Sequence, residues 1–337
     1  MTIDVVPVTP EERANWNEFV AESPQGTIYH RIEFLEVLAD HAAADLHLLI
    51  GYKSEEPRGI FPIFEQRKGP LRLVTSPPHG LGVPYLGPLL LNYQKMKQRK
   101  TDLSNKRFVE GCLEWIEETI DPHYSRIVTS WRFDDPRPFD WNGYDIDPKH
   151  TYRIPAGDED ELMRHVTKSA RRSIKRNQDA NVVVNRDDQD GLGFVYRTLE
   201  RRYDEQDRTF TPPLSYLRDL DDALPADSVR TYVAELDAEP IMGRVVLQTD
   251  GCASFWKGMA AAKNRRRTVP VGDLLNWQTM VDAINHGADE FDLVGANTPR
   301  LCRYKGKFNP ALEQYYVAER TARGVGTAID FYKRWLA

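Results

Sequence analysis

One order of elements occurs twice along this 337-residue chain, and that repetition restricts its fold more than any other feature. In each half, short strands joined by turn residues are followed by one amphipathic helix and then by a further strand. Helices packed on a mostly antiparallel sheet, twice over, predict an α+β or mixed α/β protein with two related domains. The expected strands, helix and last strand are at 46–76, 93–120 and 126–131 in the first half, and at 229–260, 273–285 and 290–295 in the second.

A loop rich in Asp, Pro and Gly separates the two halves at 133–150. Clusters of these residues mark connections, because they favour turns over regular structure. We therefore expect a first domain at 1–148 and a second at 149–319.

Composition and charge exclude several classes of protein. The chain has no run of eighteen apolar residues, and its first residues lack the basic and apolar blocks of a signal peptide, so we expect a cytoplasmic protein. A net charge of -6 argues against binding nucleic acid with the whole surface. Cys112, Cys252 and Cys302 are too widely spaced for a metal cluster or a disulfide framework, and no metal is predicted.

A basic helix is predicted near the start of the second domain. Cations at i, i+3, i+4, i+7 and i+8 cover one helical face. Such a face could bind a diphosphate, a tRNA acceptor stem or an anionic membrane, and a merely solvated face remains the alternative. The cations are Lys168, Arg171, Arg172, Lys175 and Arg176.

A second basic segment leads into a helix that we expect to begin at about Asp273. Backbone amides at a helix N-terminus suit a phosphate or pyrophosphate. Acetyltransferase-like folds carry R-x-x-G-x-G here, and Arg267 to Gly272 matches its ends, with Pro270 at the middle glycine. Because proline removes one amide donor, this departure counts against tight binding of coenzyme A. An exposed loop at 265–267 is the alternative.

A third segment, 291–310, predicts a strand that runs into a loop where cations and aromatic rings alternate. Aromatic rings beside cations can stack a base or a sugar and hold the adjoining phosphate. The alternative is a surface loop that its aromatic residues anchor to the core. The cations are Arg300, Arg303, Lys305 and Lys307, and the rings are Tyr304 and Phe308.

Taken together and in order, these motifs resemble the Fem family of aminoacyl-tRNA-dependent peptidyltransferases. The matching stretches are KSARRSIKR, VPVGDLLNW, GADEFDLVG and RYKGKF, with IYHRIEFLEVL and SPPHGLGVPYLGPLL in the first half, so the resemblance spans nearly the whole chain. It implies two tandem GNAT-like (acyl-CoA N-acyltransferase-like) domains. It also implies that a C-terminal helix at about 327–335 packs back on the first domain, which 320–337 would complete.

The resemblance also implies roles for single residues. Tyr304 and Lys305 correspond to an aromatic-lysine pair near the aminoacyl end of the tRNA and are the predicted catalytic residues. Arg208 resembles an arginine that holds the acceptor's phosphates. The family's lysine for the sugar nucleotide has no match around 30–36. The predicted phosphate- or substrate-binding set is Arg208, Arg171, Arg172, Lys175, Arg267, Gly272, Arg303 and Lys307.

Three functions remain open. The first forms an amide on an amine of a cell-wall-type precursor, with aminoacyl-tRNA as donor. The second is an acyl-CoA-dependent N-acyltransferase acting on an amino sugar or another amine, and the third a non-catalytic module that binds nucleotide sugars or anionic surfaces. No permanently bound cofactor is expected. Asp292 could serve the amine or be structural, and the absence of G-x-S-x-G, H-E-x-x-H and paired C-x-x-C argues against hydrolases and metalloenzymes.

Overall fold

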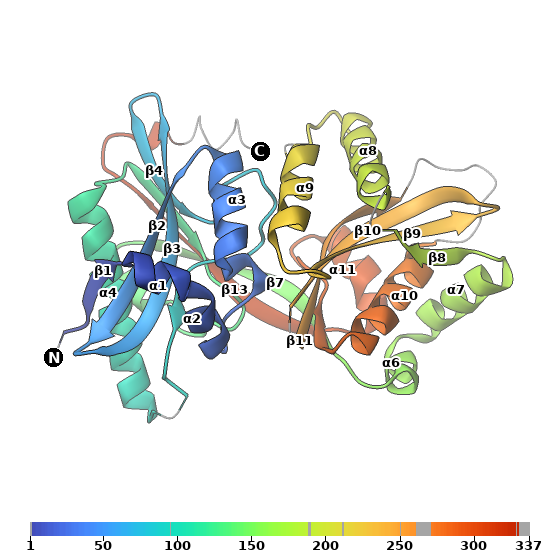
Figure 1. Ribbon diagram of the computed structural model, residues 1–337, viewed down its shortest axis with the longest axis horizontal. Coiled ribbons are helices and arrows are strands. Elements are labelled where there is room, and N and C mark those ends of the chain that lie inside the picture. Colours follow the sequence, from blue (N-terminus) through green and yellow to red (C-terminus); the bar gives the residue numbers. More distant parts are fainter. Residues whose placement is uncertain are drawn as a thin grey trace. The chain divides into compact units, whose positions relative to one another are not determined.

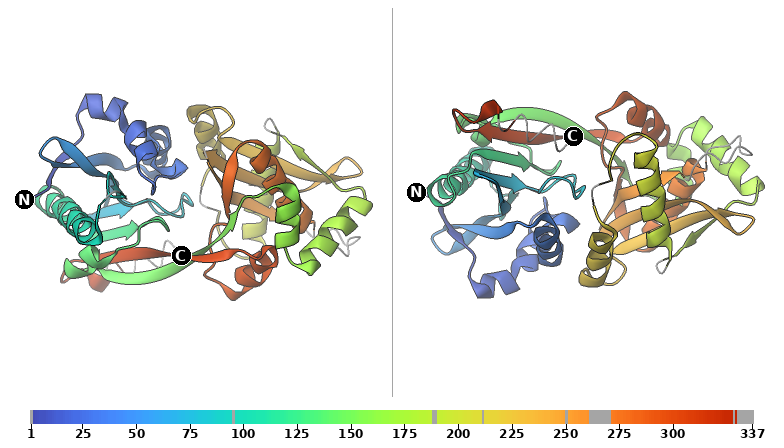
Figure 2. Two further views of the ribbon diagram at one scale, coloured as in Figure 1. Left: turned by 90° about the horizontal axis from the view of Figure 1, so that it is seen from below. Right: turned by 90° about the horizontal axis from the view of Figure 1, so that it is seen from above.

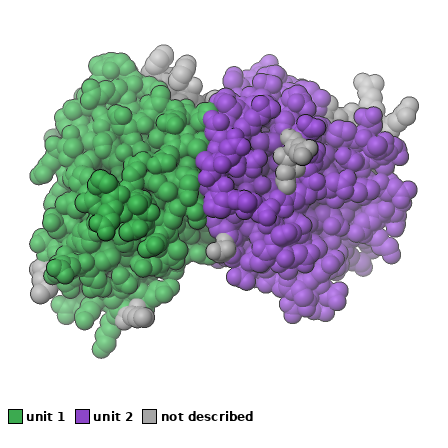
Figure 3. Space-filling view, in the orientation of Figure 1, with its two compact units in different colours: residues 1–149, 314–337 green, residues 150–313 purple. Residues whose placement is uncertain are grey.

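The computed structural model describes residues 2–94, 96–187, 190–210, 212–249, 251–260, 271–327 and 329. The chain forms two compact units (Figure 3). Unit 1 comprises Met1–Lys149 and Gln314–Ala337, and unit 2 comprises His150–Glu313. Among the described residues, no helix combines the length and apolarity needed to cross a bilayer.

Unit 1 is an antiparallel sheet that one parallel pair extends. Strands β1 to β4 are antiparallel neighbours in chain order, β4 then pairs in parallel with β6, and β13 pairs antiparallel with β6. The elements are β1 Asp4–Pro7, α1 Pro10–Ala14, α2 Trp16–Glu22, η1 Ile28–His30, α3 Ile32–Ala42, β2 Asp45–Lys53, β3 Glu56–Lys68, β4 Leu71–Ser76, β5 Leu89–Leu90, α4 Gln98–Thr119, β6 Tyr124–Val128, α5 Arg137–Trp141 and β13 Ala311–Thr321.

Helix α4 packs on this sheet through Phe108, whose ring lies on two glycines. A Cβ at Gly51 or Gly59 would lie 2.5 or 2.4 Å from that ring, so neither strand could carry a side chain there. This close approach lets the long connection between the parallel strands β4 and β6 fold back as a helix, as parallel pairing requires.

Unit 2 repeats this order. The sheet runs β7-β12-β11-β10-β9-β8, with β9, β10 and β11 antiparallel and β11 parallel to β12 after α10. The elements are β7 Asp145–Pro155, α6 Glu159–His165, α7 Lys168–Asp179, β8 Val183–Arg186, α8 Gly191–Asp204, α9 Leu214–Ala223, β9 Val229–Leu236, β10 Glu239–Thr249, β11 Gly251–Ala260, α10 Gly272–Asn285, β12 Ala288–Asp292, α11 Pro299–Lys305 and η2 Gly306–Phe308.

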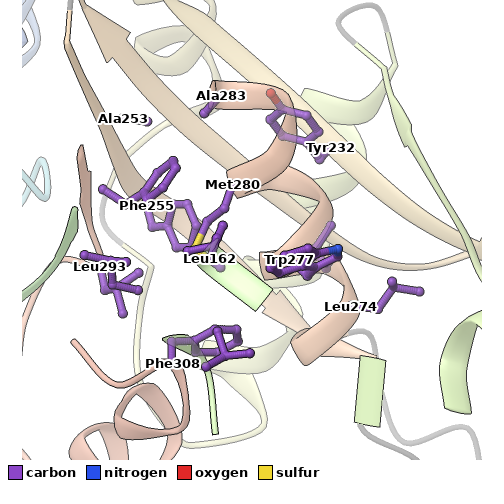
Figure 4. Packing of buried hydrophobic residues seen from close by; sticks show 14 of the residues in the cluster. Leu162, Tyr232, Ala253, Phe255, Leu274, Trp277, Met280, Ala283, Leu293 and Phe308 are labelled. Carbon is purple, nitrogen blue, oxygen red and sulfur yellow. The ribbon is translucent and has the colours of Figure 1, made fainter. Parts of the chain in front are cut away.

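The helices of unit 2 cover both faces of its sheet (Figures 1 and 2). Helices α8 and α9 lie on one face, and α7 and α10 on the other. Alternate residues of β9 show the division, because Thr231 faces Gly191 of α8 whereas Tyr232 donates a hydrogen bond to Asp282 of α10. The main core lies on the α10 face, where Trp277 and Met280 of α10 pack with Phe255 of β11 (Figure 4).

The predicted elements of the second half largely match this arrangement. The helix expected from about Asp273 begins at Gly272, and the strands expected within 229–260 are β9, β10 and β11. The loop predicted after β12 is wrong in part, because residues 299–308 form α11 and η2. Thr298 caps α11 by accepting a hydrogen bond from the Leu301 amide, and Pro299 begins it, which are ordinary helix-start signals. Strand β13 was not predicted.

Most of the expected C-terminal helix at 327–335 lies outside the described residues. Of that segment the structure describes Thr327 and Ile329. The Ile329 side chain is buried with Leu73 and Tyr124 in unit 1.

Candidate functional site

The sheet of unit 2 opens beside the second half of β11. Strands β11 and β12 pair from Gly251 opposite Ala288 to Ser254 opposite Asp292, where β12 ends. Strand β11 continues to Ala260, paired there with β10 alone. The end of β12 therefore lies next to a strand edge whose far half has no neighbour on that side among the described residues.

Lys305 ends α11 and points back to the segment after β12. Its ammonium donates hydrogen bonds to the carbonyl oxygens of Val294 and Gly295, the second at 2.8 Å. Burial, helped by the positive charge of Arg244, lowers the pKa of Lys305 to about 8. An ammonium has three N–H donors, so one remains after these two bonds.

Tyr304 lies against the first turn of α10. Its hydroxyl oxygen accepts a hydrogen bond of 3.1 Å from the Asn276 side-chain amide, and burial raises its pKa. A Cβ on Gly272 would lie 2.5 Å from that hydroxyl, so the contact requires glycine. The hydroxyl hydrogen of Tyr304 has no acceptor among the described residues and can serve a ligand.

Arg244 of β10 is the residue of this site that the sequence analysis missed. Its guanidinium lies over the Phe255 ring, with Cζ 4.7 Å from the ring centroid, on the same face as α10. The buried Nε has no hydrogen-bond partner, and no carboxylate pairs with Arg244 within the described part of the chain. Burial accordingly lowers its pKa. The available signal was one arginine in an otherwise apolar strand segment.

These three side chains form a cationic site with unused N–H and O–H donors. Arg244 is close enough to Lys305 and Tyr304 to act on the pKa of each. Buried donors normally have partners, so a group of unused donors around two cations favours an anion or a developing oxyanion. No group of His, Cys, Asp or Glu side chains that could hold a metal ion occurs among the described residues.

Lys307 is engaged in an ion pair rather than open to a ligand. Its ammonium lies 3.0 Å from a carboxylate oxygen of Asp273, which is fully buried in the first turn of α10. The same ammonium lies 5.3 Å from the centroid of the Tyr304 ring. A carboxylate thus already occupies the favourable potential at this helix N-terminus.

Asp292, considered above as a carboxylate for the amine, supports the segment that holds Lys305. One of its oxygens accepts hydrogen bonds from the Thr151 hydroxyl at 2.7 Å and from the Val294 amide at 2.8 Å. Asp292 is fully buried. These bonds fix Val294 in its left-handed conformation, with φ of 50°, and so aim its carbonyl at Lys305.

The predicted basic helix is α7, and its cations differ in their surroundings. Arg171 is structural in this arrangement, because its Nη1 donates to the carbonyls of Met163 and Arg164 at 3.2 and 3.1 Å, and to that of Val166, at the end of α6. The other four cations are exposed and make no ion pair with the described residues. These are Lys168, Arg172, Lys175 and Arg176.

The remaining predicted residues are not gathered at one place. Arg208 follows α8 and stacks on Tyr203, with Cζ 5.4 Å from the ring centroid, so it lies on the face opposite α7 and α10. Arg303 is exposed on α11. Arg267 and Pro270 lie outside the described residues, so the R-x-x-G-x-G variant is described only at Gly272.

Comparison with known proteins agrees with this architecture. Residues 163–306 match the family described as acetyltransferase (GNAT) domain. This match identifies residues 163–306 as a GNAT-type domain, and the protein as an acyltransferase. No curated protein matches its sequence.

Solved structures extend the likeness to both units of this acyltransferase. FemX superposes with a TM-score of 0.70 at 13% identity, covering 93% of this chain and 96% of that one. L-PGS from Bacillus licheniformis gives 0.55 at 12% identity, covering 98% of each chain. A tandem GNAT protein from the clavulanic acid biosynthesis pathway gives 0.51 at 14% identity, covering 95% and 98%. At such identities the likeness establishes the tandem GNAT fold alone.

Proposed function

We propose that the protein transfers an aminoacyl group from aminoacyl-tRNA to an amine of a cell-wall-type precursor and forms an amide. The observation that carries this proposal is the group of unused donors on Arg244, Lys305 and Tyr304 beside the open edge of β11. Attack by an amine on an ester carbonyl develops negative charge on the carbonyl oxygen, and preorganised donors stabilise that charge. The structural likeness to FemX supports the aminoacyl donor.

Two features favour a tRNA donor over coenzyme A. The buried carboxylate of Asp273 lies where a pyrophosphate would use the N-terminus of α10, and Pro270 removes one amide from the segment before that helix. Helix α7, which carries the four exposed cations, lies on the same face of the sheet as α10, and these cations offer a path for an RNA backbone. Use of charged tRNA would place the protein in the cytoplasm.

The acyl-CoA-dependent N-acyltransferase remains the second candidate, because the matched domain family is one of acetyltransferases. In that reaction the same donors would serve the thioester carbonyl. The third candidate, a module that binds nucleotide sugars or anionic surfaces, would bind its ligand without turnover.

One set of titrations separates the three. Thermal unfolding is followed with bulk charged tRNA, coenzyme A, acetyl-coenzyme A and a nucleotide-linked sugar peptide, and product formation is measured with each donor. We expect stabilisation by charged tRNA and the sugar peptide, and amide formation from that pair alone. Product from acetyl-coenzyme A would favour the second candidate, and stabilisation without product the third.

A further inference from the structure

Lys257 of β11 lies on the other face of the sheet, in an aromatic setting without a counter-charge. Its ammonium is 5.1 Å from the Trp256 ring centroid and 5.6 Å from that of Phe210. Trp256 packs against Tyr216 of α9, and Phe210 against Tyr203 of α8, with centroids 5.9 and 5.2 Å apart. No hydrogen bond or ion pair joins Lys257 to any residue that the structure describes.

A β-bulge directs Lys257 to this face. Phe255 pairs with Val246 and Lys257 with Val245, so Trp256 is an extra residue in β11. Bulges re-aim side chains, and here Trp256 and Lys257 both face the α8 and α9 side while Phe255 stays in the α10 core. Lys257 comes three residues after Ser254, the last residue that β11 pairs with β12. It therefore flanks the open edge of β11 from the face opposite Arg244.

The electrostatic setting suits a lysine that changes charge near neutral pH. Burial alone lowers the pKa of Lys257 to about 8. Helices α8 and α9 carry charged side chains, and Arg208 follows α8, but none of these groups contributes to the pKa of Lys257. Glu200 of α8 interacts with the Tyr196 hydroxyl instead. With such a pKa, about a tenth of Lys257 is neutral at pH 7.

We propose that Lys257 is the base that takes a proton from the ammonium of the acceptor, which would enter on the α8 and α9 face. The inference rests on the acyl transfer proposed above, whichever donor is used. The acceptor ammonium gives one proton to the neutral Nζ of Lys257. The amine nitrogen then attacks the donor carbonyl carbon, where the C–N bond forms and the bond to the leaving oxygen or sulfur breaks. The second amine proton leaves with that atom as a hydroxyl or thiol, and Lys257 releases its proton to water.

In this arrangement, stabilisation of the carbonyl and deprotonation of the acceptor amine occur on opposite faces of one strand edge. The cations Arg244 and Lys305 act on the carbonyl from the α10 face, and an uncharged amine is generated on the other. A lysine that served only to stack on Trp256 and Phe210 would need its positive charge at all times. The two roles therefore predict opposite responses to replacement by arginine.

The test compares wild type with Lys257→Met, Lys257→Arg and the exposed control Lys53→Met of unit 1. Initial rates of amide formation are measured from pH 6 to 10 with bulk charged tRNA and the nucleotide-linked sugar peptide, and with acetyl-coenzyme A and the same acceptor. We expect both Lys257 variants to lose about 100-fold in kcat/KM for the acceptor at pH 7, with the donor KM unchanged. The deficit should be constant below pH 8 and shrink above it, because free amine then becomes available from solution.

Each outcome decides the inference. Activity of Lys257→Arg near that of wild type, or a deficit of Lys257→Met that does not change with pH, would overturn it while leaving the proposed function in place. Absence of product from wild type with both donors would overturn both. Competitive labelling of folded wild type with acetic anhydride provides a readout free of catalysis, and reactivity of Lys257 that titrates near pH 10 rather than near pH 8 would also refute the role. Thermal unfolding of each variant checks that the fold is kept.

Discussion

At the scale of single residues, the ammonium of Lys305 is the group that the carbonyl-stabilising role needs most. The bonds to Val294 and Gly295 hold it in place and leave one N–H for the substrate. We expect Lys305→Met to reduce kcat about 100- to 1,000-fold, the usual loss on removing one oxyanion donor. Single-turnover rates with charged tRNA measure this, and Lys53→Met serves as control. Unchanged turnover in Lys305→Met would refute the role.

The lowered pKa of Lys305 also predicts an alkaline limit to activity. Lys305 must be protonated to donate with a full charge, and its pKa of about 8 in the free protein means that this charge is lost as pH rises through 8. We expect kcat/KM for the donor to fall above pH 8 in wild type and in Lys257→Met. The decrease should be absent in Lys305→Met. A decrease of equal size in Lys305→Met would assign it to another group.

Arg244 should lower the free energy of unfolding while it contributes to binding of the donor. A buried cation without a counter-charge costs free energy of folding, so Arg244→Met should unfold at the same or a higher temperature while its donor KM rises about tenfold or more. The comparison variant is Arg153→Met, because the Arg153 side chain is buried and, unlike that of Arg244, is paired with a carboxylate, that of Glu290. Breaking that pair should cost about 3 kcal/mol. If Arg244→Met were destabilised to the same degree, that result would contradict the conclusion that Arg244 has no counter-charge.

At the scale of elements, the contact between α10 and α11 should depend on the absence of a side chain at Gly272. An added Cβ would lie 2.5 Å from the Tyr304 hydroxyl. Gly272→Ala should therefore push Tyr304 from Asn276, with a loss of about 1–3 kcal/mol in the free energy of unfolding and a lower kcat. Gly306→Ala is the control, since a Cβ there meets nothing within 4 Å. Equal stability of the two variants in urea unfolding would show that α11 adjusts freely.

The sequence predicted those elements whose periodicity comes from burial. The apolar residues that predicted α10 recur at helical spacing and pack in or against the core of unit 2; they are Leu274, Trp277, Val281 and Ile284. Turn residues between β9, β10 and β11 marked those strands. Helix α11 buries no residue fully, so its cations and aromatic rings lack an apolar period and were taken for a loop. Thr298 and Pro299 are helix-start signals, but the helix that follows them has only 7 residues.

The candidate site could be predicted only in part, because charge alone does not reveal pairing. Lys305 and Tyr304 were found from a local motif, but Lys307 has the same composition around it and is bound to Asp273. Arg244 and Lys257 each appear as one cation in an apolar strand. Their importance comes from what the fold leaves unpaired around them, and that depends on residues far away in the chain.

At the scale of the whole molecule, the repeated order of elements was readable because both units close an antiparallel set of strands with a helix and a parallel strand. Arg208 and the cations of the basic helix were predicted to belong to one phosphate- or substrate-binding set. The structure separates them by the sheet of unit 2, because α7 and α8, the helix that Arg208 follows, lie on opposite faces of that sheet. In the proposed reaction, the donor would accordingly bind on the α7 and α10 face of this sheet and the acceptor on the α8 and α9 face.

Because the net charge is -6, measurements of tRNA binding test whether a local group of cations outweighs the total charge of the protein. An acidic protein repels RNA at long range, so binding must come from a local group of cations, here the four exposed ones of α7. Replacing all four with Gln should lower the slope of log Kd against log salt by about 3–3.5, since each phosphate contact contributes roughly 0.7–0.9. Fluorescence anisotropy of charged tRNA from 50 to 200 mM salt, roughly the range over which such contacts are lost, measures this.

The control neutralises four exposed cations of unit 1 and changes the total charge equally. These are Lys53, Lys68, Arg99 and Lys100. Equal slopes in the two variants would show that net charge, and not α7, governs the interaction.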